Sequence, residues 1–177
     1  MVVKAETTNL FEDGGFGDGG EDLWTGGNWS FSGDTWNVVW ANSIKYSSNA
    51  ANGTTSGIEM SYENDGTVDM SQTIASLSAG SYTMTGTICD PNGKAGNVKV
   101  YHSGSESDAY TIPSSFGEFT YQFTLAEDVT NYTIGFQITC PAGAWVCMDT
   151  VSLVKNDSTG EGGTEEGGNT EGGTEED

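Results

Sequence analysis

Apolar and polar residues alternate with a period of two along most of this chain. Residues 81–88 read SYTMTGTI, which places Tyr82, Met84 and Ile88 on one face. This is the pattern of a β-strand with one buried face. It recurs in five further segments: Ile58–Tyr62, Val68–Met70, Asn97–His102, Phe119–Leu125 and Tyr132–Cys140.

Turn-forming runs rich in Gly, Asn, Asp and Pro separate these segments, and no amphipathic helix of useful length is apparent. The runs are residues 64–66, 78–80, 90–93 and 126–128. Short, regularly spaced strands predict an all-β domain, an antiparallel β-sandwich (jelly roll).

The composition changes sharply near Lys155. Residues 156–177 contain eight acidic residues but no lysine, aromatic or aliphatic residue. Such a segment cannot bury enough apolar surface to offset its ordering entropy, and its glycines and like charges favour an extended linker. We predict a disordered N-terminal segment at 1–8, a folded domain at 9–155 and an acidic Gly/Thr/Glu-rich linker at 156–177. The linker implies a monomer tethered to further domains.

The net charge excludes several partners. The chain has a formal charge of -21, with five lysines and no arginine. Binding to nucleic acid requires Lys or Arg to neutralise phosphates, and anionic membrane surfaces attract basic segments. We therefore predict neither nucleic-acid binding nor membrane binding.

No catalytic motif accompanies the strands. The single histidine, His102, has the parity of Val98 and Val100, so we predict a structural role for it. A glycosidase needs two opposed carboxylates. The acids here concentrate in turns and in the tail, where solvated charge is the simpler explanation. We predict that the domain is not an enzyme, with a glycosidase of sandwich fold as a rival hypothesis.

Aromatic residues favour binding instead. A short Gly-rich region holds Trp24, Trp29, Phe31, Trp36 and Trp40. Pyranose rings pack their C–H groups on flat indole surfaces, and a few placed polar groups then select the ligand. Trp36 and Trp40 share the parity of Val38, and Trp145 follows a Pro-Gly loop where exposure is plausible. Core packing remains the alternative for each tryptophan.

Polar side chains occupy the outward positions of several strands. If these strands share one sheet, hydroxyl groups form the floor of a groove, flanked by Tyr, Gln and Lys, that could hold a sugar chain. An ordinary solvated sheet face is the alternative. The outward residues are Thr83, Thr85, Thr87, Lys99, Tyr101, Gln137 and Thr139.

The chain has three cysteines, Cys89, Cys140 and Cys147. The odd count and the spacing do not form a dense disulfide framework or a C-x-x-C metal pattern. Cys140 and Cys147 could bridge across the intervening loop, or all three could be free thiols buried in strands.

Several motifs resemble those of jelly-roll carbohydrate-binding modules over residues 9–154. The opening NLFEDGGF at 9–16, the strand pair SQTIASLSAGSYT at 71–83 and the ending TIGF, AGAW and MDTVSL between 133 and 153 carry this resemblance. The ending, together with SGDTWNV at 32–38, is most similar to family 61 modules, which are attached to bacterial endo-β-1,4-galactanases.

The resemblance implies a non-catalytic, extracellular bacterial module that targets an appended glycoside hydrolase to plant cell-wall polysaccharide, with β-1,4-galactan as the first candidate. A xylan- or β-glucan-binding module of the same fold, or a structural or adhesive cell-surface domain, is the alternative. The candidate carbohydrate-binding residues are Trp36, Trp40, Tyr101 and Trp145 for stacking, and Asn37, Lys99 and Gln137 for hydrogen bonds.

The same resemblance implies a structural Ca²⁺ near the edge of the sandwich. Six to eight oxygen ligands are needed, from carboxylates and carbonyls. Gly17 stands where the family has its opening Glu, and Thr150 follows the closing Asp. The candidate metal ligands are Glu12, Asp13, Asp18 and Asp149.

Overall fold

The computed structural model describes residues 8–16, 28–35, 38–41 and 57–156. The regular elements of these residues are all strands. They are β1 (Ser30–Gly33), β2 (Val38–Ala41), β3 (Gly57–Ser61), β4 (Gly66–Leu77), β5 (Gly80–Cys89), β6 (Asn97–His102), β7 (Ser105–Glu106), β8 (Tyr110–Thr111), β9 (Gly117–Leu125), β10 (Val129–Cys140) and β11 (Trp145–Lys155).

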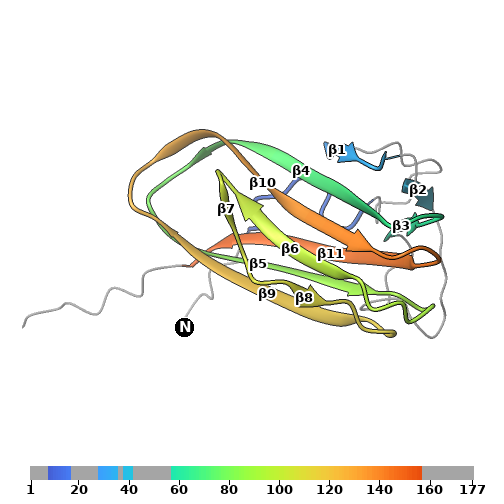
Figure 1. The fold of residues 1–177 in the computed structure, drawn as a ribbon. Coiled ribbons are helices and arrows are strands. Elements are labelled where there is room, and N and C mark those ends of the chain that lie inside the picture. The colour runs from blue at the N-terminus through green and yellow to red at the C-terminus, as the bar shows by residue number, and fades with distance from the viewer. Residues whose placement is uncertain (1–7, 17–27, 36–37, 42–56, 157–177) are drawn as a thin grey trace, which may run out of the picture.

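The strands form two stacked antiparallel sheets, which confirms the predicted β-sandwich (Figure 1). Sheet A has the order β1-β4-β10-β6-β7, with β8 also paired to β6. Sheet B has the order β2-β3-β11-β5-β9. The neighbours β4 and β10 in sheet A and β11 and β5 in sheet B each have ten or more residues, and they form the long interior of the two layers.

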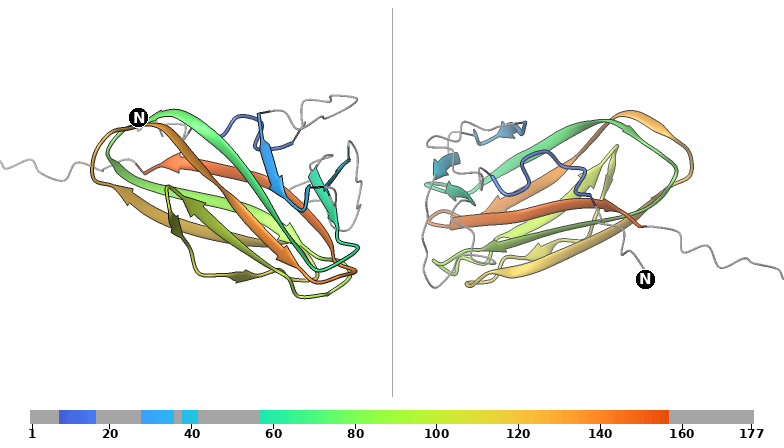
Figure 2. Two further views of the ribbon diagram at one scale, coloured as in Figure 1. Left: turned by 45° about the horizontal axis from the view of Figure 1, so that its top comes forward. Right: turned by 180° about the vertical axis from the view of Figure 1, so that it is seen from behind.

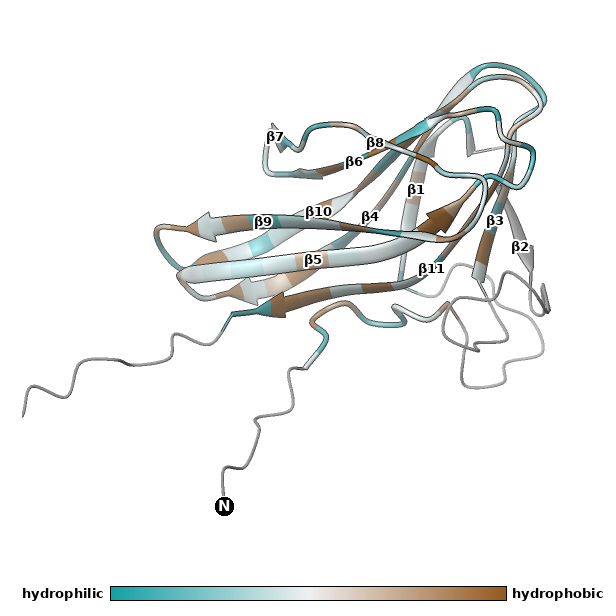
Figure 3. Cartoon of the chain, turned by 90° about the horizontal axis from the view of Figure 1, so that it is seen from below, coloured by the Kyte–Doolittle hydropathy of each residue, from teal (hydrophilic) through white to brown (hydrophobic). Residues whose placement is uncertain are grey.

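The inner faces of the two sheets bury the apolar residues that the alternation had placed there. Tyr82, Met84 and Ile88 of β5 are all at most 1% exposed, and Ile134 and Phe136 of β10 are fully buried. Figure 3 shows hydrophobic and hydrophilic residues alternating along strands such as β9. The prediction of inward positions is therefore confirmed.

The N-terminal segment 8–16 ties the two sheets together along one open side. Its backbone bonds to β11, where Leu10 N donates to Leu153 O at 2.8 Å. On sheet A, Gln72 donates to the Glu12 carbonyl and accepts from the Glu12 amide. Figure 2 shows this segment, in dark blue, running beside β11.

An aromatic cluster seals the same side. Phe11, Phe16 and Trp29 are at most 6% exposed, and the Trp29 ring lies 5.0 Å from Phe11 and 6.0 Å from Phe136. Trp29 is therefore a core residue.

His102 joins the sheets from within. Its Nδ1 bonds to the Tyr132 hydroxyl and its Nε2 lies 3.0 Å from the Tyr121 hydroxyl, while its ring stacks on Phe123 at 4.4 Å. Tyr121 and Phe123 belong to sheet B, whereas His102 belongs to sheet A. Burial lowers the pKa of His102. The predicted structural role is confirmed.

All three cysteines are buried free thiols, as one of the two alternatives had it. Cys140 lies on β10 in sheet A and Cys147 on β11 in sheet B.

The predicted disordered N-terminal segment and acidic linker fall almost wholly outside the described residues, so both stay predictions. The described part has no helix long and apolar enough to cross a membrane.

Candidate functional site

Polar side chains form rows across the outer face of sheet A. Strand register places Lys99 of β6 opposite Gln137 of β10, Gln137 opposite Asp69 of β4, and Asp69 opposite Ser32 of β1. Residues at matched positions in neighbouring antiparallel strands stand side by side on the same face. The structure thus brings Lys99 and Gln137 together, as predicted.

The neighbouring row contains Tyr101, Gly135 and Ser71. The Ser71 side chain lowers the pKa of the Tyr101 hydroxyl, so this hydroxyl lies close to Ser71 although β10, with Gly135, stands between their strands. The Tyr101 ring must therefore extend across Gly135, where no side chain obstructs it. Half-burial raises the pKa of Tyr101, the nearby Ser71 side chain opposes this rise, and the negative charge of Asp69 adds to it.

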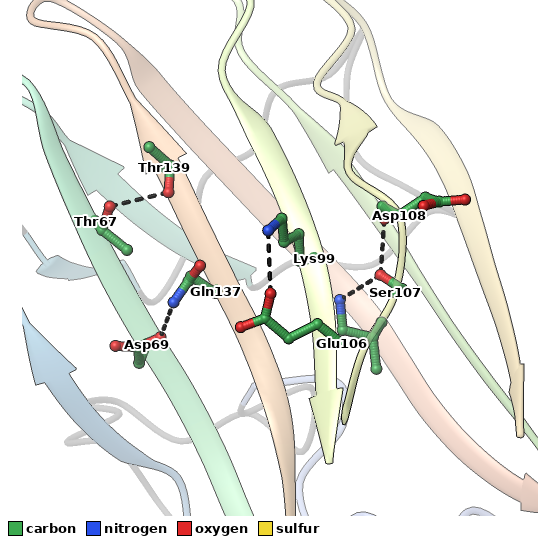
Figure 4. A network of polar contacts seen from close by, with 9 residues as sticks. Thr67, Asp69, Lys99, Glu106, Ser107, Asp108, Gln137 and Thr139 are labelled. Atoms are coloured by element: carbon green, nitrogen blue, oxygen red, sulfur yellow. Dashed lines mark hydrogen bonds and ion pairs between the residues drawn. The ribbon is translucent and has the colours of Figure 1, made fainter. Parts of the chain in front are cut away.

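Hydrogen bonds and one ion pair hold the polar groups in place (Figure 4). Gln137 Nε2 donates to Asp69 Oδ1 at 3.1 Å, and Lys99 Nζ lies 3.1 Å from Glu106 Oε2. Ser107 Oγ accepts the Val100 amide at 2.9 Å, which fastens the chain after β7 to β6. The donors and acceptors on this face are thus oriented before any ligand arrives.

A surface hollow of about 360 Å³ opens over these two rows. Most of its lining residues are polar and one is aromatic; two of them were predicted, and the sequence analysis missed the other five. The lining residues are Ser32, Asp69, Tyr101, Gly104, Ser105, Glu106 and Gln137. Strand parity could have predicted the outward position of Asp69, because it lies between the inward residues Val68 and Met70.

A second hollow of about 450 Å³ lies at the end of sheet A, next to the row of Asn97, Thr139 and Thr67. Thr67 and Thr139 bond through their hydroxyls at 2.9 Å, and Asp34 Oδ2 accepts the Thr67 amide at 2.7 Å. The polar face is therefore continuous from the Tyr101 row to this end of the sheet.

The expected floor of threonine hydroxyls is not part of this face. Thr83, Thr85 and Thr87 belong to β5, which lies in sheet B. Their outward side chains bond instead to β11 and its neighbours; Thr85 Oγ1, for example, lies 2.7 Å from Ser152 Oγ. The condition that these strands share one sheet was wrong, because parity assigns a face to each strand but does not assign its sheet.

The tryptophan candidates are not united with Tyr101. Trp36 and Asn37 lie outside the described residues, and Trp40 is described only as backbone in β2 of sheet B. Trp145 is the first residue of β11, also in sheet B, and is half-buried. Its amide donates to Asp90 Oδ1 at 3.0 Å.

Asp90 anchors the loops at this end of the sandwich. Its side chain is fully buried and accepts the amides of Asn92, Lys94 and Trp145 at 2.8–3.0 Å. Backbone donors thereby replace the water that a buried carboxylate has lost. This residue lies in a predicted turn and was not singled out by the sequence analysis.

Three of the four metal-ligand candidates lie in the described part of the chain. Asp13 and Asp149 are on adjoining segments, because Val151 N donates to Gly14 O at 2.9 Å, and Asp149 is 2% exposed. The Glu12 carboxylate bonds to the Asn28 side chain. Asp18 lies outside the described residues. Within the described ranges, no three His, Cys, Asp or Glu side chains gather as a metal cluster.

The Asp13–Asp149 region still suits calcium in its chemistry. Calcium takes backbone carbonyls as well as carboxylates, so it does not require three acidic side chains at one point. A carboxylate with the burial of Asp149 is a suitable ligand. The calcium site stays a prediction.

Solved structures share this architecture, although the sequence matches no protein-family model and no curated protein. TmCBM61 in complex with β-1,4-galactotriose is 20% identical, with a TM-score of 0.67 over 85% of this chain and all of that one. The CBM22-1 xylan-binding domain of Xyn10C from Paenibacillus barcinonensis is 12% identical, with a TM-score of 0.55 over 87% and 97% of the two chains.

The enzymatically active domain of tailspike protein 4 of bacteriophage CBA120 is 16% identical, with a TM-score of 0.56. The match covers 84% of this chain but 21% of that one. The architecture is a β-sandwich of the kind seen in these carbohydrate-binding modules. The predicted likeness to family 61 is confirmed in the fold.

Proposed function

We propose that this domain is a non-catalytic carbohydrate-binding module whose binding face is the outer surface of sheet A. Its first candidate ligand is β-1,4-galactan. The observation that carries the proposal is the Tyr101 ring, which extends across Gly135 beside the bonded pair Gln137–Asp69.

Such a face matches the two kinds of surface that a sugar chain presents. The Tyr101 ring offers an apolar platform for the C–H groups of a pyranose. Gln137, Asp69 and the Lys99–Glu106 pair offer donors and acceptors for its hydroxyls. Because these groups are already oriented, less side-chain freedom is lost when the ligand binds.

The choice of galactan rests on the likeness to TmCBM61, whose structure holds β-1,4-galactotriose. Xylan is the next candidate, since the CBM22-1 domain is described as xylan-binding. As a module on a linker, the domain would be extracellular and would hold an appended glycoside hydrolase near plant cell-wall polysaccharide. Tethering raises the effective concentration of the enzyme at its substrate.

Affinity gel electrophoresis tests the function. The domain should be retarded by β-1,4-galactan, and Tyr101→Ala should abolish the retardation. Retardation by xylan or β-glucan alone would replace galactan as the ligand. Unaltered mobility in all three, with a folded protein, would overturn the proposal and favour a structural or adhesive domain.

We also propose a structural Ca²⁺ held by Asp149 and Asp13, with Glu12 and Asp18 as further candidate ligands. The ion would supply positive charge between the N-terminal segment and β11. Adding calcium to chelator-treated protein should raise the melting temperature, since a ligand that binds only the folded state stabilises it. Asp149→Asn should remove this increase; an equal increase in the variant would exclude Asp149 as a ligand.

A further inference from the structure

Two of the three cysteines face each other across neighbouring strands of sheet B. Cys89 ends β5, Cys147 is the third residue of β11, and the register pairs them directly. Their strand neighbours Ile88 and Met148 point into the core. Both cysteines therefore point to the opposite, outer side of the sheet, where they are 0% and 4% exposed.

The spacing of such a pair suits a disulfide. Directly opposed residues in antiparallel strands have Cα atoms about 4.5 or 5.5 Å apart, and disulfides span Cα separations of about 4.4–6.8 Å. Cys140 is not an alternative partner for either thiol, because it lies at the end of β10 in sheet A, whereas Cys89 and Cys147 are paired in sheet B.

We propose that Cys89 and Cys147 form an intramolecular cross-strand disulfide when the domain folds in the presence of a low-molecular-weight disulfide. The inference concerns a modification site and does not depend on the proposed sugar-binding function. It also replaces the pair Cys140–Cys147, which was one alternative from the sequence.

The chemistry proceeds by two exchanges. The Cys89 thiolate displaces one thiolate from the small disulfide and forms a mixed disulfide. Cys147, after losing its proton, displaces the second small thiolate and closes the protein disulfide. The small disulfide takes up two electrons and two protons to become two thiols, and the protein loses the same number.

The Cys89–Cys147 disulfide would lie next to the contact between Asp90 and Trp145 and would stabilise the folded domain. Cys89 directly precedes Asp90, and Trp145 lies two residues before Cys147, so the disulfide would reinforce the Asp90–Trp145 contact. It would also close a loop of residues 89–147 and constrain the unfolded chain.

Refolding tests the proposal without requiring an oxidant to enter the folded domain. The reduced, denatured protein is refolded in reduced and oxidised glutathione, alkylated and digested for mass spectrometry. The expected product carries one link between Cys89 and Cys147, with Cys140 alkylated. Three alkylated cysteines, a mixed disulfide as end product, or any link to Cys140 would overturn the proposal.

Matched variants sharpen the result. Cys140→Ala should retain the link, whereas Cys89→Ala and Cys147→Ala should each leave two alkylated cysteines. Reductant should lower the urea midpoint of the wild-type domain but not that of Cys89→Ala. If Cys140→Ala fails to fold, the peptide map of the wild-type protein still decides the pairing. An unchanged midpoint on reduction of a mapped bond would overturn the stabilising role.

Discussion

Gln137 of β10 donates a hydrogen bond from Nε2 to Asp69 Oδ1 of β4 at 3.1 Å, in the middle of the outer face of sheet A. This bond fixes which oxygen and nitrogen atoms are presented to a ligand. Gln137→Ala should therefore weaken galactan binding by about 5–30-fold, the equivalent of about 1–2 kcal/mol. Isothermal titration calorimetry measures the change. Gln122→Ala, on the exposed face of β9 in sheet B, is the matched control and should bind like the wild type.

Tyr101 should contribute its ring rather than its hydroxyl. Tyr101→Ala removes the platform over Gly135 and should reduce affinity by about 10–100-fold, since buried aromatic anchors contribute the largest shares at binding sites. Tyr101→Phe retains the ring, loses the hydroxyl and should retain most of the affinity. If both variants lost binding equally, the hydroxyl rather than the ring would be the contact.

Gly135 should tolerate no side chain. A Cβ there would lie 2.2 Å from the Met70 carbonyl oxygen and 2.7 Å from Ser71 Cβ, and the first of these is backbone of β4. Gly135→Ala should lower the free energy of unfolding by about 1–3 kcal/mol, as overpacking does. Urea denaturation measures it. Thr133→Ala, two residues earlier on the same strand and exposed, should cost less than Gly135→Ala.

His102 should make stability depend on pH. Burial lowers its pKa below the ordinary value of about 6.5, so the unfolded state binds a proton before the folded state does. Stability from the neutral ring is therefore fully present above about pH 6.5 and falls as the pH drops toward the folded pKa. The slope is at most about 1.4 kcal/mol per pH unit.

Urea melts of the wild type and His102→Gln between pH 7.5 and 5, a range chosen to bracket about 6.5, measure this effect. The difference between the two proteins should shrink as the pH falls through that window. The subtraction cancels contributions from carboxylates far from the substitution. A constant difference would show that His102 titrates alike in both states.

Asp90 should be among the more costly charges to remove. Asp90→Ala leaves the amides of Asn92, Lys94 and Trp145 without their acceptor and should destabilise the domain by about 2–5 kcal/mol. Thermal melting measures the loss, and Asp108→Ala, at an exposed carboxylate, is the control. Melting temperatures that fall equally in both variants would contradict the anchoring role.

The candidate site could be predicted in part. Parity placed Lys99, Tyr101 and Gln137 on the outward faces of their strands, and the pairing of β6 with β10 brings them together on one face. Their partners were harder to find. Glu106 reaches Lys99 because β7 folds back on β6. Ser71 stands in the same row as Tyr101 because β4 and β6 both pair with β10, one on each side. Both contacts depend on which strands are neighbours, which no local pattern encodes.

The sequence by itself determined six of the strands, their inward residues and the structural role of His102, because the period of side-chain direction in a strand is a local property of the backbone. Only the tertiary structure decided which strands share a sheet. Strand pairing joins segments far apart in the chain through backbone hydrogen bonds that are alike for nearly every residue. For that reason the outward threonines of β5 lie on sheet B, whereas Tyr101 lies on sheet A. For the same reason Cys147 is paired with Cys89 on the neighbouring strand and not with Cys140.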